Sequence, residues 1–167
     1  MSIGVARVLV VGVGNAARGD DAAGLLVAQH VRPLLAPLEA AGRVVVATLD
    51  GELLPLLDLW RGAQAVVVAD AVTTGAPPGE VTRFDLTAGP LPASLRFAST
   101  HAFSVAGAVE LGRALGRLPD RVILYGIEGR SFDYGATVSA VVAGAAAAAA
   151  AVVAAEVAAL LTPRRAA

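Results

Sequence analysis

The stretch V-L-V-V-G-V-G-N-A-A-R-G-D-D-A-A-G, residues 8–24, decides how this chain folds. Its first four residues are apolar without polar alternation, which is typical of a central strand buried on both faces. Gly12 and Gly14 then end the strand, and glycine allows another backbone or a ligand to come close. Asp20 and Asp21 follow where a helical pattern begins. The stretch therefore predicts a strand, a glycine turn and paired carboxylates at the start of a helix.

Strands and helices alternate along the rest of the chain. Short apolar segments predict strands, and longer segments with apolar residues three or four apart predict helices. The expected strands are residues 7–12, 43–49, 65–69, 80–85 and 121–127. The expected helices are residues 20–35, ending before Pro37, residues 53–60, residues 101–115, opened by Ser99 and Thr100, and an Ala-rich helix that closes the chain. Residues 86–100 are expected to form a loop.

This alternation predicts a three-layer α/β/α fold of the phosphorylase/hydrolase-like type, with a mostly parallel twisted sheet and one edge strand. The length of 167 residues predicts a single domain covering residues 1–167. The net charge is -1 and no run of like charges occurs, so we expect neither a nucleic acid nor an anionic membrane as partner. The chain has no cysteine, which excludes disulfides and thiolate nucleophiles.

Residues 134–155 carry no charge and are about as long as a membrane span. They are mostly alanine, which contributes little to membrane insertion, so we expect a helix packed on the sheet. The N-terminal residues lack the organisation of a signal peptide. The sequence thus predicts a cytoplasmic protein.

Ligands of parallel α/β sheets bind beyond the carboxyl ends of the strands. That rule selects residues 14–21 after the first strand, then Asp50, Asp70 and Glu128 after later strands. Crowded carboxylates repel one another unless a proton or a cation compensates them. Asp21 and Asp70 with His101 would supply two oxygens and one nitrogen, a set suited to zinc, nickel or manganese.

Structural roles for the same residues stay open. Asp20 and Asp21 would also serve as an N-cap and first-turn acid of the helix. Asp70 would also hold the following T-T-G turn through backbone hydrogen bonds. Glu128 would suit either a salt bridge or the site. His30, in the middle of a helix, is expected on the surface.

A dinucleotide-binding turn is the main alternative, since Gly12-x-Gly14-x-x-Ala17 follows a strand and precedes a helix. The intervening Asp20 and Asp21 put two negative charges where the phosphates would lie. The acid expected about 20 residues further on is missing, because Asp50 is too distant. We therefore expect no nucleotide cofactor.

Four motifs in order carry a resemblance to a known family. They are G-V-G-N-A-A-R-G-D-D-A-A-G at residues 12–24, A-D-A-V-T-T-G-A-P-P-G at 69–79, S-T-H at 99–101, and G-I-E at 126–128 followed by T-V-S at 137–139. Together they resemble the hydrogenase maturation endopeptidases, which trim a C-terminal peptide from the large subunit of nickel-iron hydrogenases. The resemblance covers nearly the whole chain.

The resemblance implies that Asp21, Asp70 and His101 form a divalent metal site. In that family the site recognises nickel already loaded in the precursor of the large subunit. Nickel would then arrive with the substrate rather than stay as a permanent cofactor. The precursor is accordingly the expected partner.

Candidate catalytic residues are Asp21, Asp70 and Asp50. We expect a water, polarised by the metal or deprotonated by Asp50 or Asp70, to attack the scissile peptide bond. The expected substrate-binding residues are Gly12, Gly14, Asn15, Asp50 and Glu128. A nickel-checking or metal-binding module without proteolysis on the same fold is the alternative function.

Overall fold

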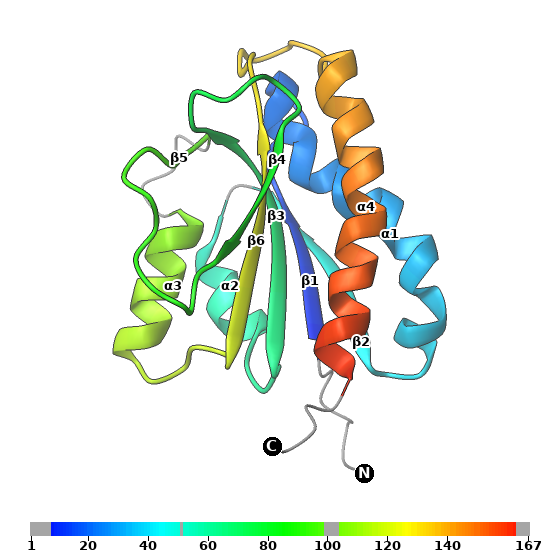
Figure 1. Ribbon diagram of the computed structural model, residues 1–167, viewed down its shortest axis with the longest axis vertical. Helices are drawn as coiled ribbons and strands as arrows, with labels where there is room; N and C mark the ends of the chain where they lie inside the picture. Colours follow the sequence, from blue (N-terminus) through cyan, green and yellow to red (C-terminus); the bar gives the residue numbers. More distant parts are fainter. Residues whose placement is uncertain (1–7, 51, 99–103, 163–167) are drawn as a thin grey trace.

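Residues 8–50, 52–98 and 104–162 are described by the structure, a computed structural model (Figure 1). Strands and helices alternate within them, as the sequence predicts. The elements are β1 (Val8–Val13), the 3₁₀ helix η1 (Gly19–Ala22), α1 (Ala23–Ala40), β2 (Val44–Leu49), α2 (Leu54–Leu59), β3 (Ala65–Thr73), β4 (Val81–Asp85), β5 (Arg96–Phe97), α3 (Val105–Ala114), β6 (Arg121–Glu128) and α4 (Ala140–Leu161).

The sheet has the strand order β2-β1-β3-β6-β4, and β5 pairs with β3 outside this path. The pairs β1–β2, β1–β3 and β3–β6 are parallel, whereas β4 lies antiparallel on β6 at the edge. The predicted mostly parallel sheet with an antiparallel edge strand is confirmed, and the two-residue β5 adds a second antiparallel pairing, with β3. The chain goes from β1 to β2 on one side and then returns to β3 on the other. The strand order therefore reverses between β1 and β3, where sheets of this type bind ligands.

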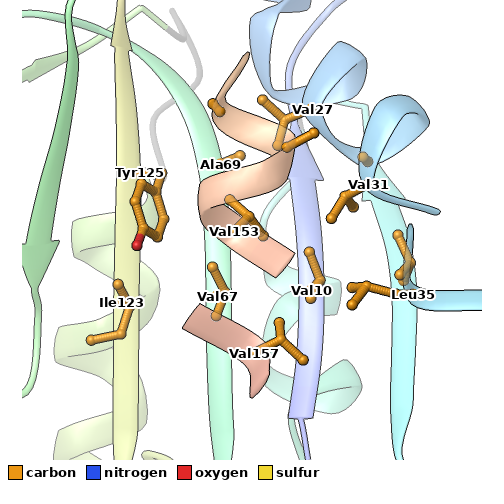
Figure 2. Packing of buried hydrophobic residues seen from close by; sticks show 14 of the residues in the cluster. Val10, Val27, Val31, Leu35, Val67, Ala69, Ile123, Tyr125, Val153 and Val157 are labelled. Carbon is orange, nitrogen blue, oxygen red and sulfur yellow. The ribbon is translucent and has the colours of Figure 1, made fainter. Parts of the chain in front are cut away.

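Helices cover both faces of the sheet, which confirms the predicted three layers (Figure 1). Helices α1 and α4 pack on one face. Figure 2 shows this core, in which the labelled strand residues Val10, Val67, Ala69, Ile123 and Tyr125 lie with Val27, Val31, Leu35, Val153 and Val157 of the two helices. Helices α2 and α3 pack on the other face through residues such as Leu56, Trp60 and Val109. Successive residues of a strand point to opposite faces, and helices cover both faces of the central strands. These strands are therefore apolar on both faces.

The start of α1 lies against the backbone of the central strands. A Cβ atom on Gly24 would come within 2.2 Å of the carbonyl oxygens of Ala69 and Val13. A Cβ on Gly14 would come within 2.0 Å of the Asp21 carbonyl oxygen. The glycines of the opening stretch therefore allow η1 and α1 to pack directly against the backbones of β1 and β3.

Two elements run further than the sequence predicts. Helix α1 continues through Pro33 and Pro37 to Ala40, because Val31 and Leu35 bury their side chains in the core and offset the backbone hydrogen bonds that proline removes. Strand β3 continues past residue 69 to Thr73, because β6 pairs with it on one side and β5 on the other. Strand β5 lies in the expected loop 86–100 and is too short to show periodicity.

Helix α3 begins at Val105, after Ser104, whose Oγ accepts a hydrogen bond from the Gly107 N–H at 3.2 Å. The expected continuous helix over residues 101–115 is wrong at its start, because Ser104 is extended and caps α3. Residues 101–103 lie outside the described residues. Within the described ranges, α4 alone is long and apolar enough to cross a membrane, judged by length and composition. A core helix passes the same test, and α4 packs on the sheet and alongside α1, as predicted.

Candidate active site

Asp70 lies inside β3 rather than after it, on the face that α2 and α3 cover. The register pairs Ala69 with Gly12, so Asp70 sits where β1 comes to its end. Its side chain is buried, with 1% of the residue exposed. Neither carboxylate oxygen has a hydrogen-bond partner of normal geometry among the described residues. A carboxylate buried in this way is costly unless a proton or a cation compensates it.

Asp21, in η1, is the second buried carboxylate of the crevice. Burial, followed by the charge of Asp21, raises the pKa of Asp70 well above its usual value, and the Ala71 N–H offsets this only in part. The structure thus brings Asp21 and Asp70 close enough for their charges to interact, and their joint role as a site stays a prediction. Two such carboxylates favour a shared proton or a cation between them.

Arg18 is a site residue that the sequence does not reveal. It is 7% exposed, and its Nη1 donates to Asp21 Oδ2 at 3.0 Å and to the Ala98 carbonyl at 3.3 Å. Its Cζ lies 5.4 Å from the centroid of the Tyr134 ring. Only its place in the motif between the glycines and the paired acids draws attention to it.

His101, the third predicted ligand, lies outside the described residues, so the complete set of three is not assembled within them. In residues 8–50, 52–98 and 104–162 no group of three or more His, Asp and Glu side chains is arranged to hold a metal ion. Ala98, the last described residue before residue 99, lies against β3 next to Asp70. The N–H of Ala98 donates to the carbonyl of Ala71 at 3.2 Å.

Asp20 does not act as the predicted helix cap, since no side chain caps η1 or α1. Its fully buried carboxylate accepts hydrogen bonds from the backbone N–H groups of Arg130 at 2.9 Å, Ser131 at 3.1 Å and Ser139 at 2.7 Å. Burial alone would raise the pKa of Asp20, but these donors lower it below its usual value. Asp20 therefore ties the loop after β6 to the turn after β1.

Glu128, the last residue of β6, holds the turn for which Asp70 is the alternative candidate. Its carboxylate accepts from the Thr74 N–H at 2.9 Å, the Thr74 hydroxyl at 2.9 Å and the Gly75 N–H at 3.2 Å. The turn-holding interpretation of Asp70 is therefore wrong, because the register of β3 with β6 brings Glu128 opposite Val72 and next to the turn. Among the described residues Glu128 forms no salt bridge; its role in substrate binding stays a prediction.

The other predicted substrate-binding residues lie around the same end of the sheet. Asn15 Oδ1 accepts from the Ala17 N–H at 2.9 Å and so shapes the turn after β1. Asp50 is exposed after β2, which flanks β1 on the side opposite β3. Two strand spacings, about 10 Å, therefore separate the strands that carry Asp50 and Asp70. A groove of about 550 Å³ opens nearby on α2, lined by Glu52, Leu54, Pro55, Asp58 and Leu59.

The fold and the site define a three-layer α/β protein with a buried acidic pair at the point where its strand order reverses. The chain belongs to the hydrogenase maturation protease family, whose profile matches residues 44–156. This matched range contains Asp70. By its family the chain is a hydrogenase maturation endopeptidase, as its motifs predict.

Solved structures of that family share the fold. The crystal structure of the maturation protease HycI from Thermococcus kodakarensis KOD1 superposes with a TM-score of 0.68 at 24% identity, covering 92% of this chain and 93% of that one. HybD from Thermococcus kodakarensis gives 0.62 at 26%, covering 90% and 97%. HybD from Escherichia coli gives 0.64 at 22%, covering 88% and 89%. A comparison with curated proteins finds no match.

Proposed function

We propose that this enzyme removes a C-terminal peptide from the nickel-loaded precursor of a nickel-iron hydrogenase large subunit. The whole chain, residues 1–167, acts as one domain in the cytoplasm. The observation that supports this most is the state of Asp70, which is buried beside Asp21 and has no hydrogen-bond partner of normal geometry among the described residues. A site kept in this state suits a substrate that brings its own cation.

Asp21, Asp70 and His101 would contact the nickel that the precursor carries. Carboxylate oxygens and an imidazole nitrogen are suitable ligands for this ion. Without a cation, the raised pKa of Asp70 favours its protonated form. A cation at the site reverses that preference, because its charge stabilises both carboxylates. The site therefore responds to the difference between a loaded and an empty precursor.

Cleavage requires a water molecule positioned at the scissile peptide bond and a base that takes its proton. Asp50 and Asp70 are the candidates. Asp50 is exposed to an incoming chain, whereas Asp70 is buried. The variant Asp50→Asn separates them: loss of a general base lowers kcat by about 10²–10⁴-fold. Full cleavage by Asp50→Asn would remove Asp50 from the mechanism.

The function itself is tested by incubating the enzyme with nickel-loaded and nickel-free precursor and following the precursor by mass spectrometry. We expect the mass of a C-terminal peptide to be lost from the loaded precursor alone. Equal cleavage of both forms would contradict the nickel requirement. Tight binding of the loaded precursor without loss of mass would instead support a nickel-checking module without proteolysis.

A further inference from the structure

We propose that Arg18 is a specificity-determining residue that excludes free divalent cations from the acidic pair and yields only to an ion delivered by the precursor. The proposal rests on the proposed function, because it concerns the same site. It starts from a cation that the chain itself places there. The guanidinium of Arg18 contacts Asp21, one of the two carboxylates expected to receive the nickel.

The position of Arg18 is built into the crevice rather than being a chance surface pairing. The side chain is 7% exposed, and its Nη1 bridges the carboxylate of Asp21 and the carbonyl of Ala98. The charges of a buried ion pair interact more strongly than those of an exposed one, because water does not screen them. A cation that comes to Asp21 must therefore either displace Arg18 or stay beside a positive charge.

Two kinds of contact hold the guanidinium of Arg18. Within the described part of the chain, Nε of Arg18 is buried without a hydrogen-bond partner, so the guanidinium is held through Nη1. Its Cζ already lies 5.4 Å from the ring of Tyr134, which is 74% exposed. This cation–π contact already exists while Arg18 pairs with Asp21, so it helps to keep the guanidinium at the site whether or not that pair is formed.

Hydrogen bonds on both sides of Tyr134 hold its loop beside the turn that carries Arg18. Asp20 accepts hydrogen bonds from Arg130, Ser131 and Ser139, and the Gly135 N–H donates to the carbonyl of Ala17 at 2.8 Å. The ring therefore stays beside the turn that carries Arg18.

Repulsion of this kind discriminates between two forms of the same ion. A free divalent cation brings its full charge of +2 against the guanidinium. An ion that arrives with anionic ligands of the precursor brings less net charge, and contacts elsewhere on the precursor supply binding energy to move Arg18. Specificity achieved by a repulsive group is a general strategy of binding sites.

The test is the affinity of the protein alone for Ni²⁺, measured by calorimetry on the wild type, Arg18→Met, Arg18→Lys and a control, Arg117→Met. Removing a unit charge from beside the site should raise Ni²⁺ affinity about tenfold or more in Arg18→Met. Arg18→Lys keeps the positive charge beside the site and should stay within about threefold of the wild type. Arg117 is exposed after α3, so Arg117→Met should match the wild type. Damage to the fold would weaken binding, so a gain in affinity has no trivial structural explanation.

An Arg18→Met variant with wild-type or weaker Ni²⁺ affinity would overturn the proposal. Should this variant fold poorly, Arg18→Gln gives a second test, because its amide can still donate a hydrogen bond but carries no charge. Arg18→Gln should also raise Ni²⁺ affinity about tenfold. Wild-type or weaker Ni²⁺ affinity of this variant would also overturn the proposal. These titrations use no precursor, so a failure to cleave loaded precursor counts against the proposed function alone.

Discussion

Two buried carboxylates at the same end of the sheet, Asp20 and Asp70, are in opposite states. Asp20 is completely buried and accepts three backbone N–H hydrogen bonds. Asp70 is 1% exposed, and no described residue hydrogen-bonds either of its oxygens with normal geometry. Burial favours the neutral form of both, yet the pKa of Asp20 is lowered and that of Asp70 is raised. A buried carboxylate that accepts several hydrogen bonds holds the fold together, and a buried carboxylate without them at the same end of the sheet marks the candidate site.

Glu128 belongs with Asp20, because its oxygens are engaged by the turn at Thr74 and Gly75. Asp21 belongs to neither group, because it accepts a hydrogen bond from Arg18 and its charge also acts on Asp70. The comparison therefore separates residues whose loss should harm stability from residues whose loss should harm only function. Four variants test this separation.

The largest effect is expected for Asp70→Asn. Cleavage of the loaded precursor should fall by roughly 10³-fold, because a ligand for the nickel is lost. Stability should rise at the same time by about 1–3 kcal/mol at neutral pH, because a buried carboxylate without a partner is removed. Mass spectrometry and urea unfolding measure the two effects. A destabilised Asp70→Asn variant would contradict the conclusion that the Asp70 carboxylate lacks stabilising hydrogen bonds from the described residues.

The pH dependence of this gain follows from the raised pKa of Asp70. Stability linked to its proton is fully present below the unfolded-state pKa of about 4 and is lost as pH rises through the folded-state pKa. The stability advantage of Asp70→Asn over the wild type should therefore be absent at pH values below about 4 and grow as pH rises.

The next effect is a loss of stability in Asp20→Asn, by about 2–3 kcal/mol at neutral pH, because three buried backbone N–H groups lose a charged acceptor. The lowered pKa of Asp20 means that this stabilisation is present above pH of about 4 and is lost as pH falls through the folded-state pKa. Urea unfolding at several pH values checks it. Asp133→Asn, in the same loop but exposed, is the matched control and should leave stability unchanged.

A smaller loss is expected for Glu128→Gln, about 1–2 kcal/mol, since the amide keeps one acceptor oxygen for the turn at Thr74 and Gly75. Faster amide exchange at these two N–H groups would show that the effect is local. The neighbouring exposed Glu80 provides the control variant Glu80→Gln. Unchanged exchange in Glu128→Gln would show that Glu128 does not hold the turn.

The smallest effect is expected far from the site, at Tyr125→Phe. The Tyr125 hydroxyl donates to Glu156 Oε2 at 2.7 Å, and burial together with this bond raises the pKa of Tyr125 to about 12. Its removal should cost about 1 kcal/mol, because Arg83 still pairs with Glu156. Cleavage should stay at the wild-type rate. A reduced rate with unchanged stability would show that α4 affects the site.

Much of the fold could be predicted from local pattern. The apolar strands, the amphipathic helices and the edge strand 81–85 are all present. The rule for strand ends selects residues 14–21, Asp50, Asp70 and Glu128 independently of any motif, but it does not distinguish among them. Element ends were less predictable. Helix α1 passes Pro37 because core packing outweighs the lost hydrogen bond, and no single-residue propensity carries that information.

The division of roles among the carboxylates could not be predicted in the same way. The position of Asp20 before a helix indicates a cap, but its partner Arg130 lies 110 residues further along the chain. No sequence pattern marks Arg18 as a site residue. Its ion pair with Asp21 belongs to the candidate site only because folding brings Asp21 close to Asp70. Contacts of this kind depend on which loops the sheet brings to one end.

The sequence by itself determined the alternation of strands and helices, the family, and the candidate acids, because periodicity and short motifs are properties of neighbouring residues. Only the tertiary structure decided which buried carboxylates accept hydrogen bonds from the rest of the described chain and which one does not. The hydrogen-bond donors for a buried carboxylate come from segments far apart in the chain. The same residue type therefore links two loops at Asp20 and lacks hydrogen-bond partners of normal geometry among the described residues at Asp70.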